Sequence, residues 1–381
     1  MTKLLETPYG TQDFLPEEAA AKRITEQKIF ELFASFGYEE VVTPAMEYLE
    51  TLTTSGGREI ESHLFKMFDA QNRTLALRHE MTTPIARLTV GRLKNSPLPL
   101  KLSYNTNVFR FRKNQPGRQC EFYQAGVELL GISNAFADAE VIGLAAQALK
   151  ISGLKNFKIC LGQVEFAGGL MENLSPELQA EIKFAIERHD IVALENLPVE
   201  DSLKKIPKLQ GGREILTAAE SIAENDRSKK ALENLKEIYR LLEIYGVADK
   251  ITFDLGLIRD FEYYTGMVFE AYAAGVGYSL AGGGRYDNML KDFGKDYPAT
   301  GFALGIERIL SARKIQGVEE NFQAKDFYLS YAAGKEDFAI KKAAELRAAG
   351  KIVEVSLMPQ GKIDAEKICA EKNCKELIYL E

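Results

Sequence analysis

The sequence predicts an α+β fold in which an antiparallel sheet flanked by helices carries a helical insertion and is followed by a small α/β unit. Three observations predict this. Segments of alternating polar and apolar residues, separated by glycine clusters, run from Asp254 to Leu310 and are typical of half-buried strands. Residues 165–245 have a charged, leucine-rich helical pattern. Strands alternate with helices after residue 325.

The amino-terminal part is expected to form a helix, a strand, a hairpin and a second helix. Residues of high helix propensity run from Pro16 to about Ser35 and are closely followed by a glycine. Residues 39–44 have the pattern of a strand that a proline ends. Residues 64–69 and 73–78 alternate around a polar turn and predict a hairpin, and an apolar helical pattern covers residues 85–93.

A longer hairpin is predicted next, with strands at Lys101–Arg112 and Gln119–Gly131 and a basic tip between them. An amphipathic helix over Asp138–Gly153 and a strand over Lys158–Gly162 follow. Residues 165–245 are interpreted as an insertion of surface helices whose periodicity carries no chemistry, and His189 within it is expected to be structural.

The last part of the chain is expected to be a separate βαβαβ domain of residues 325–381, with a parallel sheet. The domain before it is expected to span residues 1–320 and to include the insertion. A polar link over residues 316–325 separates the two. Strands are predicted at 327–332, 352–357 and 377–380, with helices at 335–349 and 365–372.

Composition limits the classes of function. The chain has 381 residues, 46% of them hydrophobic and 27% charged, as in an ordinary globular protein of two or three domains. No apolar run approaches a membrane span, and the first residues lack the apolar stretch of a secretion signal. Four scattered cysteines predict a reducing cytoplasm and no metal site. A net charge of −7 argues against a large nucleic-acid footprint.

Several motifs carry a family resemblance. Residues 257–266, Leu-Ile-Arg-Asp-Phe-Glu-Tyr-Tyr-Thr-Gly, resemble the histidine-specific signature of histidyl-tRNA synthetases. Residues 282–287 are similar to the family's glycine-rich strand-to-helix turn, and residues 301–308 to its third class II motif. The long hairpin resembles motif 2, and the first helix and strand are similar to motif 1, which forms the family's dimer interface. The resemblance implies a class II synthetase-like fold with a histidine-binding domain.

The resemblance also implies a binding site for free histidine. Glu80, Thr82 and Gln124 would take its α-amino group, and Arg110 and Arg259 would face its carboxylate. Glu128 and Tyr264 would hold the imidazole, and Tyr263 would line the floor. Arg308 would contact a phosphate or another anion. The alternative for Glu80 and Thr82 is capping of the helix that follows, and each other residue, taken singly, is a polar group on a sheet.

Two departures from the family pattern concern aminoacylation. Arg112 stands where the family has the glutamate that reads the adenine amine, and Asn114 replaces a proline. A donor now occupies the place of an acceptor, so adenine recognition there should fail. The carboxyl-terminal domain resembles an anticodon-binding domain but stops before its remaining strands and helix. The histidine pocket is therefore expected to be intact, whereas the elements for adenine and tRNA are not.

A protein with this combination resembles the regulatory subunit of ATP phosphoribosyltransferase, the first enzyme of histidine biosynthesis. The resemblance implies a non-catalytic, cytoplasmic chain without cofactors that binds histidine for feedback inhibition and activates a short-form catalytic subunit. It also implies a homodimer within a hetero-octamer, with no role for tRNA. Two alternatives stay open. Arg259 and Arg308 are both kept, as an active histidine–tRNA ligase requires, and a histidine-binding domain could serve another enzyme.

Overall fold

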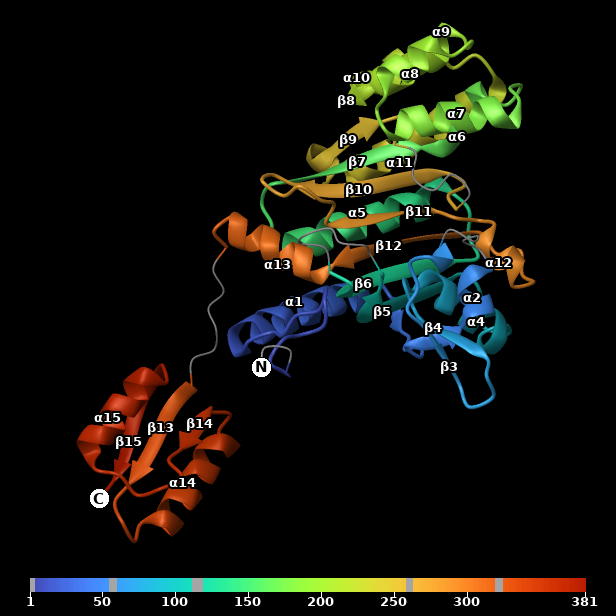
Figure 1. The fold of residues 1–381 in the computed structure, drawn as a ribbon. Helices are drawn as coiled ribbons and strands as arrows, with labels where there is room; N and C mark the ends of the chain where they lie inside the picture. The colour runs from blue at the N-terminus through green and yellow to red at the C-terminus, as the bar shows by residue number, and fades with distance from the viewer. Residues whose placement is uncertain (1–3, 55–59, 112–118, 258–262, 319–324) are drawn as a thin grey trace. The chain divides into compact units, whose positions relative to one another are not determined.

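The computed structural model describes residues 4–54, 60–111, 119–257, 263–318 and 325–381. The chain forms two compact units, Met1–Glu319 and Glu320–Glu381. Figure 1 shows the first unit as a large sheet with helices packed against it, and the second as a small sheet with its own helices.

A sheet of nine strands, counted over the described residues, organises the first unit (Figure 1). In spatial order its strands are β1 (Glu39–Glu40), β5 (Leu100–Phe109), β6 (Glu121–Leu130), β12 (Ala299–Gly305), β11 (Ala281–Arg285), β10 (Met267–Ala273), β7 (Phe157–Gln163), β9 (Ile251–Asp254) and β8 (Gln210–Gly211). The six strands from β5 to β7 pair antiparallel, as predicted. The sheet as a whole is mixed, because β1 pairs parallel with β5 and β9 pairs parallel with β7.

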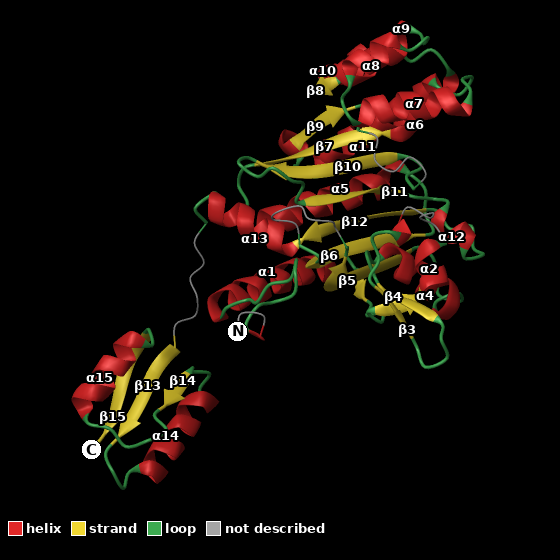
Figure 2. Cartoon of the chain, in the orientation of Figure 1, coloured by secondary structure: helices red, strands yellow, loops and turns green. Residues whose placement is uncertain are grey.

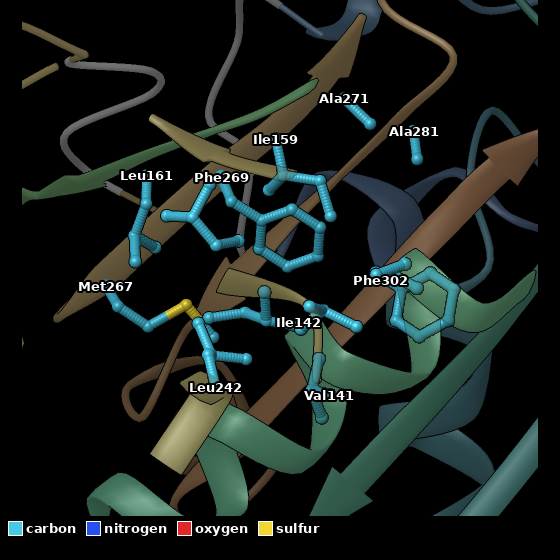
Figure 3. Packing of buried hydrophobic residues seen from close by; sticks show 14 of the residues in the cluster. Val141, Ile142, Ile159, Leu161, Leu242, Met267, Phe269, Ala271, Ala281 and Phe302 are labelled. Atoms are coloured by element: carbon cyan, nitrogen blue, oxygen red, sulfur yellow. The ribbon is translucent and has the colours of Figure 1, made fainter. Parts of the chain in front are cut away.

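Helices on one face of this sheet enclose the main hydrophobic core. They are α1 (Pro16–Ser35), α5 (Ala135–Ile151), α11 (Asp226–Ile244) and α13 (Ile306–Ile315). Alternate residues of the strands meet these helices, and Figure 3 shows Phe269 and Leu161 facing Ile142 of α5 and Leu242 of α11. Removing these side chains from water is the main term that holds the helices on the sheet.

The opposite face of the sheet carries a smaller set of elements. These are α2 (Leu49–Thr53), α4 (Thr82–Arg92), α12 (Met289–Asp292) and a three-stranded antiparallel sheet of β2 (Met46–Tyr48), β4 (Thr74–Leu77) and β3 (Lys66–Phe68). A second core forms here, where Ile85 of α4 and Leu290 of α12 pack with Tyr104 of β5. This core covers only part of the face.

The segment between β7 and β9 is largely helical, as predicted. It contains α6 (Val164–Leu170), α7 (Pro176–Glu187), α8 (Ile191–Asn196), α9 (Asp201–Lys205), η2 (Ile206–Lys208), α10 (Glu214–Glu220), α11 and η3 (Ala248–Lys250), with the short strand β8 among them. Several of these helices share a small core of their own. Helix α11 lies at the surface with its charged face exposed, but its apolar residues Leu235, Ile238 and Leu242 lie fully buried in the main core.

The predicted strand over residues 39–44 is shorter than expected. Only Glu39 and Glu40 pair with β5, and β2, which the sequence did not predict, begins six residues later. Arg78 supplies the physical reason, because its guanidinium Nη1 donates to the carbonyl of Thr43 at 2.7 Å. The backbone there is satisfied by a buried side chain rather than by a strand ladder.

The second unit is a parallel sheet with a helix on each face, as predicted. Its elements are β13 (Lys325–Tyr331), α14 (Glu336–Ala348), β14 (Val353–Val355), α15 (Lys362–Glu371) and β15 (Cys374–Leu380). The strands pair parallel in the order β14-β13-β15 (Figure 2). Leu329 faces Ala343 of α14, whereas its neighbour Tyr328 faces Ala365 of α15.

Candidate functional site

A cavity of about 790 Å³ lies on the face of the large sheet that α5 and α11 leave free. Its floor follows from the strand register. Gly282 of β11 pairs with Ala303 of β12, and Gly301 and Gly305 of β12 pair with Glu128 and Gln124 of β6. Because side chains alternate across a strand, these glycines and Ala303 leave one face of two central strands nearly bare. Residues 282–284 form strand β11, so Gly282 and Gly283 are positions where the backbone is open to the cavity rather than turns.

Gly301 is required because other groups occupy the space above it. A Cβ on Gly301 would overlap Oε2 of Glu128 and would lie 2.5 Å from the carbonyl oxygen of Val127. A Cβ on Gly284 would lie 2.8 Å from the ring of Tyr264, which covers that strand. The absence of side chains thus lets Glu128 and Tyr264 lie directly on the backbone of the sheet.

We expect Gly301→Ala to lower the free energy of unfolding by about 1–3 kcal/mol, the usual cost of overpacking, and to weaken ligand binding in the cavity. Gly91→Ala is the matched control, because a Cβ on Gly91 meets nothing within 4 Å. That change should stabilise α4 by up to about 1 kcal/mol through helix propensity. Urea denaturation followed by circular dichroism measures both, and equal stabilities of the Gly301→Ala and wild-type proteins would contradict the prediction.

Glu128 lies under the cavity and is 2% exposed. Thr82 Oγ1 donates to its Oε1 at 2.9 Å, and the hydroxyl of Tyr286 donates to its Oε2. Burial raises the pKa of Glu128 to about 8, and the nearby Glu80 carboxylate adds to the rise, while the two hydrogen bonds oppose it. The carboxyl is therefore largely protonated at neutral pH in the empty cavity.

Glu80 and Thr82 lie where α4 begins. The carboxylate of Glu80 accepts hydrogen bonds from the backbone N–H groups of Thr82 and Thr83, the latter at 3.0 Å. The capping alternative is thus confirmed for Glu80, which also lines the cavity. Thr82 is the first residue of α4, and its hydroxyl bonds to Glu128 rather than capping the helix. The capping alternative is wrong for Thr82.

Two further predicted residues line the cavity from the hairpin of β5 and β6. Nε of Arg110 donates to the carbonyl of His79 at 2.8 Å, and its guanidinium lies 5.4 Å from the ring centre of Phe122. Gln124 is 8% exposed, and its Oε1 is buried without a hydrogen-bond partner among the described residues. A buried acceptor of this kind has a free site for a donor from a ligand.

Aromatic side chains form another part of the cavity lining. The rings of Tyr263 and Tyr264 meet edge to face at 4.8 Å between centres, and Tyr263 lies 5.4 Å from Tyr286. All three residues line the cavity. Arg308 lines it from the first turn of α13, where Nη1 donates to the carbonyl of Ser279 at 2.6 Å. Arg259, Arg112 and Asn114 lie outside the described residues.

The cavity therefore contains every described residue of the predicted site, Glu80, Thr82, Arg110, Gln124, Glu128, Tyr263, Tyr264 and Arg308. Sequence reasoning missed Tyr104, Tyr286, His63 and His79, which also line it. A signal existed for Tyr286, because it follows the glycine-rich strand directly and the chain doubles back there. Nothing comparable pointed to Tyr104, whose position in the middle of β5 is that of an ordinary core residue.

A buried ion pair on the core side fixes the segment that carries Tyr286. Arg285 and Asp138 of α5 meet at 2.7 Å with side chains 7% and 2% exposed, and Arg285 also contacts Asp287 at 2.9 Å. Because successive residues of β11 point to opposite faces, Arg285 anchors to α5 while Tyr286 reaches the cavity.

In the described ranges, no group of three or more His, Cys, Asp or Glu side chains is arranged to hold a metal ion. Over the same residues, no helix combines the length and the apolar character needed to cross a membrane.

Comparison with known proteins identifies the family. A family model described as histidyl-tRNA synthetase matches residues 10–309. The ATP phosphoribosyltransferase regulatory subunit of Moorella thermoacetica is 42% identical over 360 residues, 92% of this chain and 91% of that protein. The chain belongs to the family of ATP phosphoribosyltransferase regulatory subunits. The predicted resemblance is confirmed.

Solved structures confirm the class II synthetase-like fold. A protein of Bacillus halodurans, described as an ATP phosphoribosyltransferase regulatory subunit/histidyl-tRNA synthetase, is 33% identical with a TM-score of 0.88 over 99% of both chains. The apo histidyl-tRNA synthetase of S. aureus, at 24% identity, has a TM-score of 0.73 over 99% of this chain and 90% of its own. The relatives of the family are named as regulatory rather than catalytic subunits.

Proposed function

We propose that this chain is a non-catalytic regulatory subunit of ATP phosphoribosyltransferase that binds histidine in the cavity and transmits feedback inhibition to a separate catalytic subunit. One observation carries the histidine part of the proposal, namely that the described residues of the predicted site, from four separate segments, line a single cavity. The names of the relatives support the regulatory part.

The chemistry of the cavity suits a free amino acid with a polar ring. The Oε1 atom of Gln124, which has no hydrogen-bond partner among the described residues, and the carboxylate of Glu80 offer acceptors for an ammonium group. Arg110 offers a planar cation for a carboxylate. Glu128 and Tyr264, above the bare glycine floor, offer polar groups for the two ring nitrogens, and Tyr263 closes the wall beside them.

The partner would be a short-form catalytic subunit in the cytoplasm, which this chain would activate as a homodimer within a hetero-octamer. Feedback inhibition requires that histidine bind two states of this complex with different affinity. Typical coupling free energies are about 1–3 kcal/mol, which is a change of about 5- to 150-fold in affinity.

The test is an assay of ATP phosphoribosyl transfer by the mixed subunits against histidine concentration. We expect the wild-type mixture to be inhibited by histidine. A mixture with Glu128→Ala should assemble and be activated but need at least tenfold more histidine, because its ring contact is lost. Co-purification with the catalytic subunit checks assembly. Absence of histidine inhibition in the wild-type mixture, or equal inhibition of both mixtures, would sink the proposal.

Activity as a histidine–tRNA ligase is the second candidate, because Arg308, one of the two arginines expected to face phosphates, lines the cavity. Histidine-dependent exchange of pyrophosphate into ATP separates the two functions. We expect no exchange by the chain alone, since Arg112 stands where adenine recognition needs an acceptor. Turnover comparable to that of a true synthetase would establish the ligase instead.

A further inference from the structure

Glu128 lines the cavity and forms no ion pair with a cation among the described residues. Its two oxygens accept hydrogen bonds from neutral hydroxyls, those of Thr82 and Tyr286. In the described ranges no lysine, arginine or histidine forms an ion pair with it. An ionised carboxylate buried without a cation is costly, so a buried carboxyl in such surroundings keeps its proton.

The other groups that face Glu128 reinforce this neutrality. Glu80, which precedes α4, places a negative charge near Glu128 and so disfavours ionisation of Glu128. The phenols from the other elements are Tyr104 on β5, Tyr263 and Tyr264 before β10, Tyr286 after β11, and Tyr38 after α1. The same cavity is also lined by Arg110, Arg308, His63 and His79, none of which forms a hydrogen bond or ion pair with Glu128 among the described residues. Burial raises the pKa of Tyr104, Tyr263 and Tyr286 well above the ordinary range, so they stay neutral. The neighbouring strand β12 contributes only Gly301.

We propose that histidine binds against a neutral Glu128 carboxyl positioned by Tyr286, and that the bound ring and the carboxyl then hold one shared proton. When the proton moves, the O–H bond of Glu128 breaks as an N–H bond forms on the ring, and the new charges attract each other. The proton stays within the pair. This inference rests on the proposed function, because it takes histidine as the ligand.

The proposal fixes how binding depends on pH. The imidazole of free histidine has a pKa of about 6.5, and burial raises the pKa of Glu128 to about 8. Between these two pH values the ring of free histidine is neutral and the Glu128 carboxyl of the ligand-free protein is protonated. The complex also holds one proton, so binding exchanges no proton with solvent. Above the pKa of Glu128 binding takes up a proton, and affinity falls about tenfold per pH unit. At pH values below the pKa of the free imidazole, binding of histidine releases one proton, and the affinity therefore falls as the pH decreases.

The experiment is isothermal titration calorimetry of histidine binding to the full chain in two buffers of different ionisation enthalpy. At about pH 7.2 we expect close to zero protons exchanged, and at about pH 9 close to one taken up. Glu128→Gln is the matched control, because it keeps the shape of the side chain without a titrating group. Subtracting the number of protons exchanged when histidine binds to the Glu128→Gln protein removes the contribution of the α-amino group of histidine.

The remaining outcomes each overturn the inference. A proton released at about pH 7.2 would mean that the complex holds an ionised Glu128 beside a neutral ring. Uptake at both pH values would mean that Glu128 is already ionised in the ligand-free pocket at about pH 7.2. No exchange at either would mean that the protonation of Glu128 does not change between about pH 7.2 and about pH 9, which contradicts a pKa of about 8 and the pH dependence derived from it. If no binding heat appears at any pH, the proposed function itself fails, so the two failures are distinguishable.

Tyr286 is assigned as a positioning residue, and its test uses the same readout. Its hydrogen bond favours the ionised form of Glu128, so Tyr286→Phe should move the onset of proton uptake to higher pH. Tyr328→Phe is the control, because it removes an equally buried tyrosine hydroxyl that belongs to the second unit and bonds to Gln360, and it should leave the onset unchanged. An unchanged onset in Tyr286→Phe would refute the assignment.

Discussion

Replacing Glu128 with alanine is expected to weaken histidine binding by about 10- to 150-fold. A hydrogen bond to a charged group contributes about 1.5–3 kcal/mol, and each 1.4 kcal/mol is about tenfold in affinity. The loss falls on the ring contact, because Glu128 is the buried carboxyl that lies on the bare floor at Gly301. Calorimetry at neutral pH measures the change directly.

Glu270→Gln is the control for the loss of a buried carboxylate. Glu270 of β10 is 4% exposed and accepts a hydrogen bond from a tyrosine, Tyr272, much as Glu128 does from Tyr286. It points to the same face of the sheet, yet it does not line the cavity. The Glu270→Gln protein should therefore bind histidine with the same affinity as the wild type. Equal affinities of the Glu128→Ala and wild-type proteins would refute the assignment of Glu128 to the ring.

Replacing Arg285 with methionine is expected to lower the free energy of unfolding by about 3–5 kcal/mol. The change leaves Asp138, 1% exposed on α5, without its cation. It also releases the end of β11 from α5, so Tyr286 should hold Glu128 less firmly and histidine affinity should fall. Urea denaturation followed by circular dichroism measures the first effect, and calorimetry the second.

The double variant Arg285→Met/Asp138→Leu separates the buried charge from the packing. With both charged groups replaced by apolar side chains, most of the lost stability should return, since a buried ion pair is often no more stabilising than an apolar pair. If the Arg285→Met protein unfolds at the same urea concentration as the wild type, the ion pair of Arg285 and Asp138 does not stabilise this part of the sheet.

Much of the fold could be predicted because its strands and helices follow local rules. The helix over Pro16–Ser35 begins and ends where it was expected, since high propensity, Pro16 at its start and a glycine after its end all agree. The hairpin of β5 and β6 followed from its alternation over ten residues in each strand. Prediction failed where a distant partner decides the outcome, as at Thr43, whose carbonyl is taken by Arg78.

Helix α11 shows the same limit at the level of packing. Its pattern is amphipathic, with a leucine-rich face and a charged face, and that pattern does not say what the apolar face will meet. In the structure that face meets α5 and β7 in the main core, rather than the small core of the other inserted helices. The sequence therefore predicted a helix here but not its layer.

The sequence by itself named many of the polar side chains that line the cavity, because the family motifs contain Glu80, Gln124, Glu128 and Tyr264. Only the tertiary structure decided their chemical state. The hydroxyl of Tyr286 reaches Glu128 from 158 positions away in the chain, and Thr82 reaches it from 46. Ionisation of a carboxyl depends on burial and on nearby charges, and both are set by the packing of strands and helices that are distant in sequence.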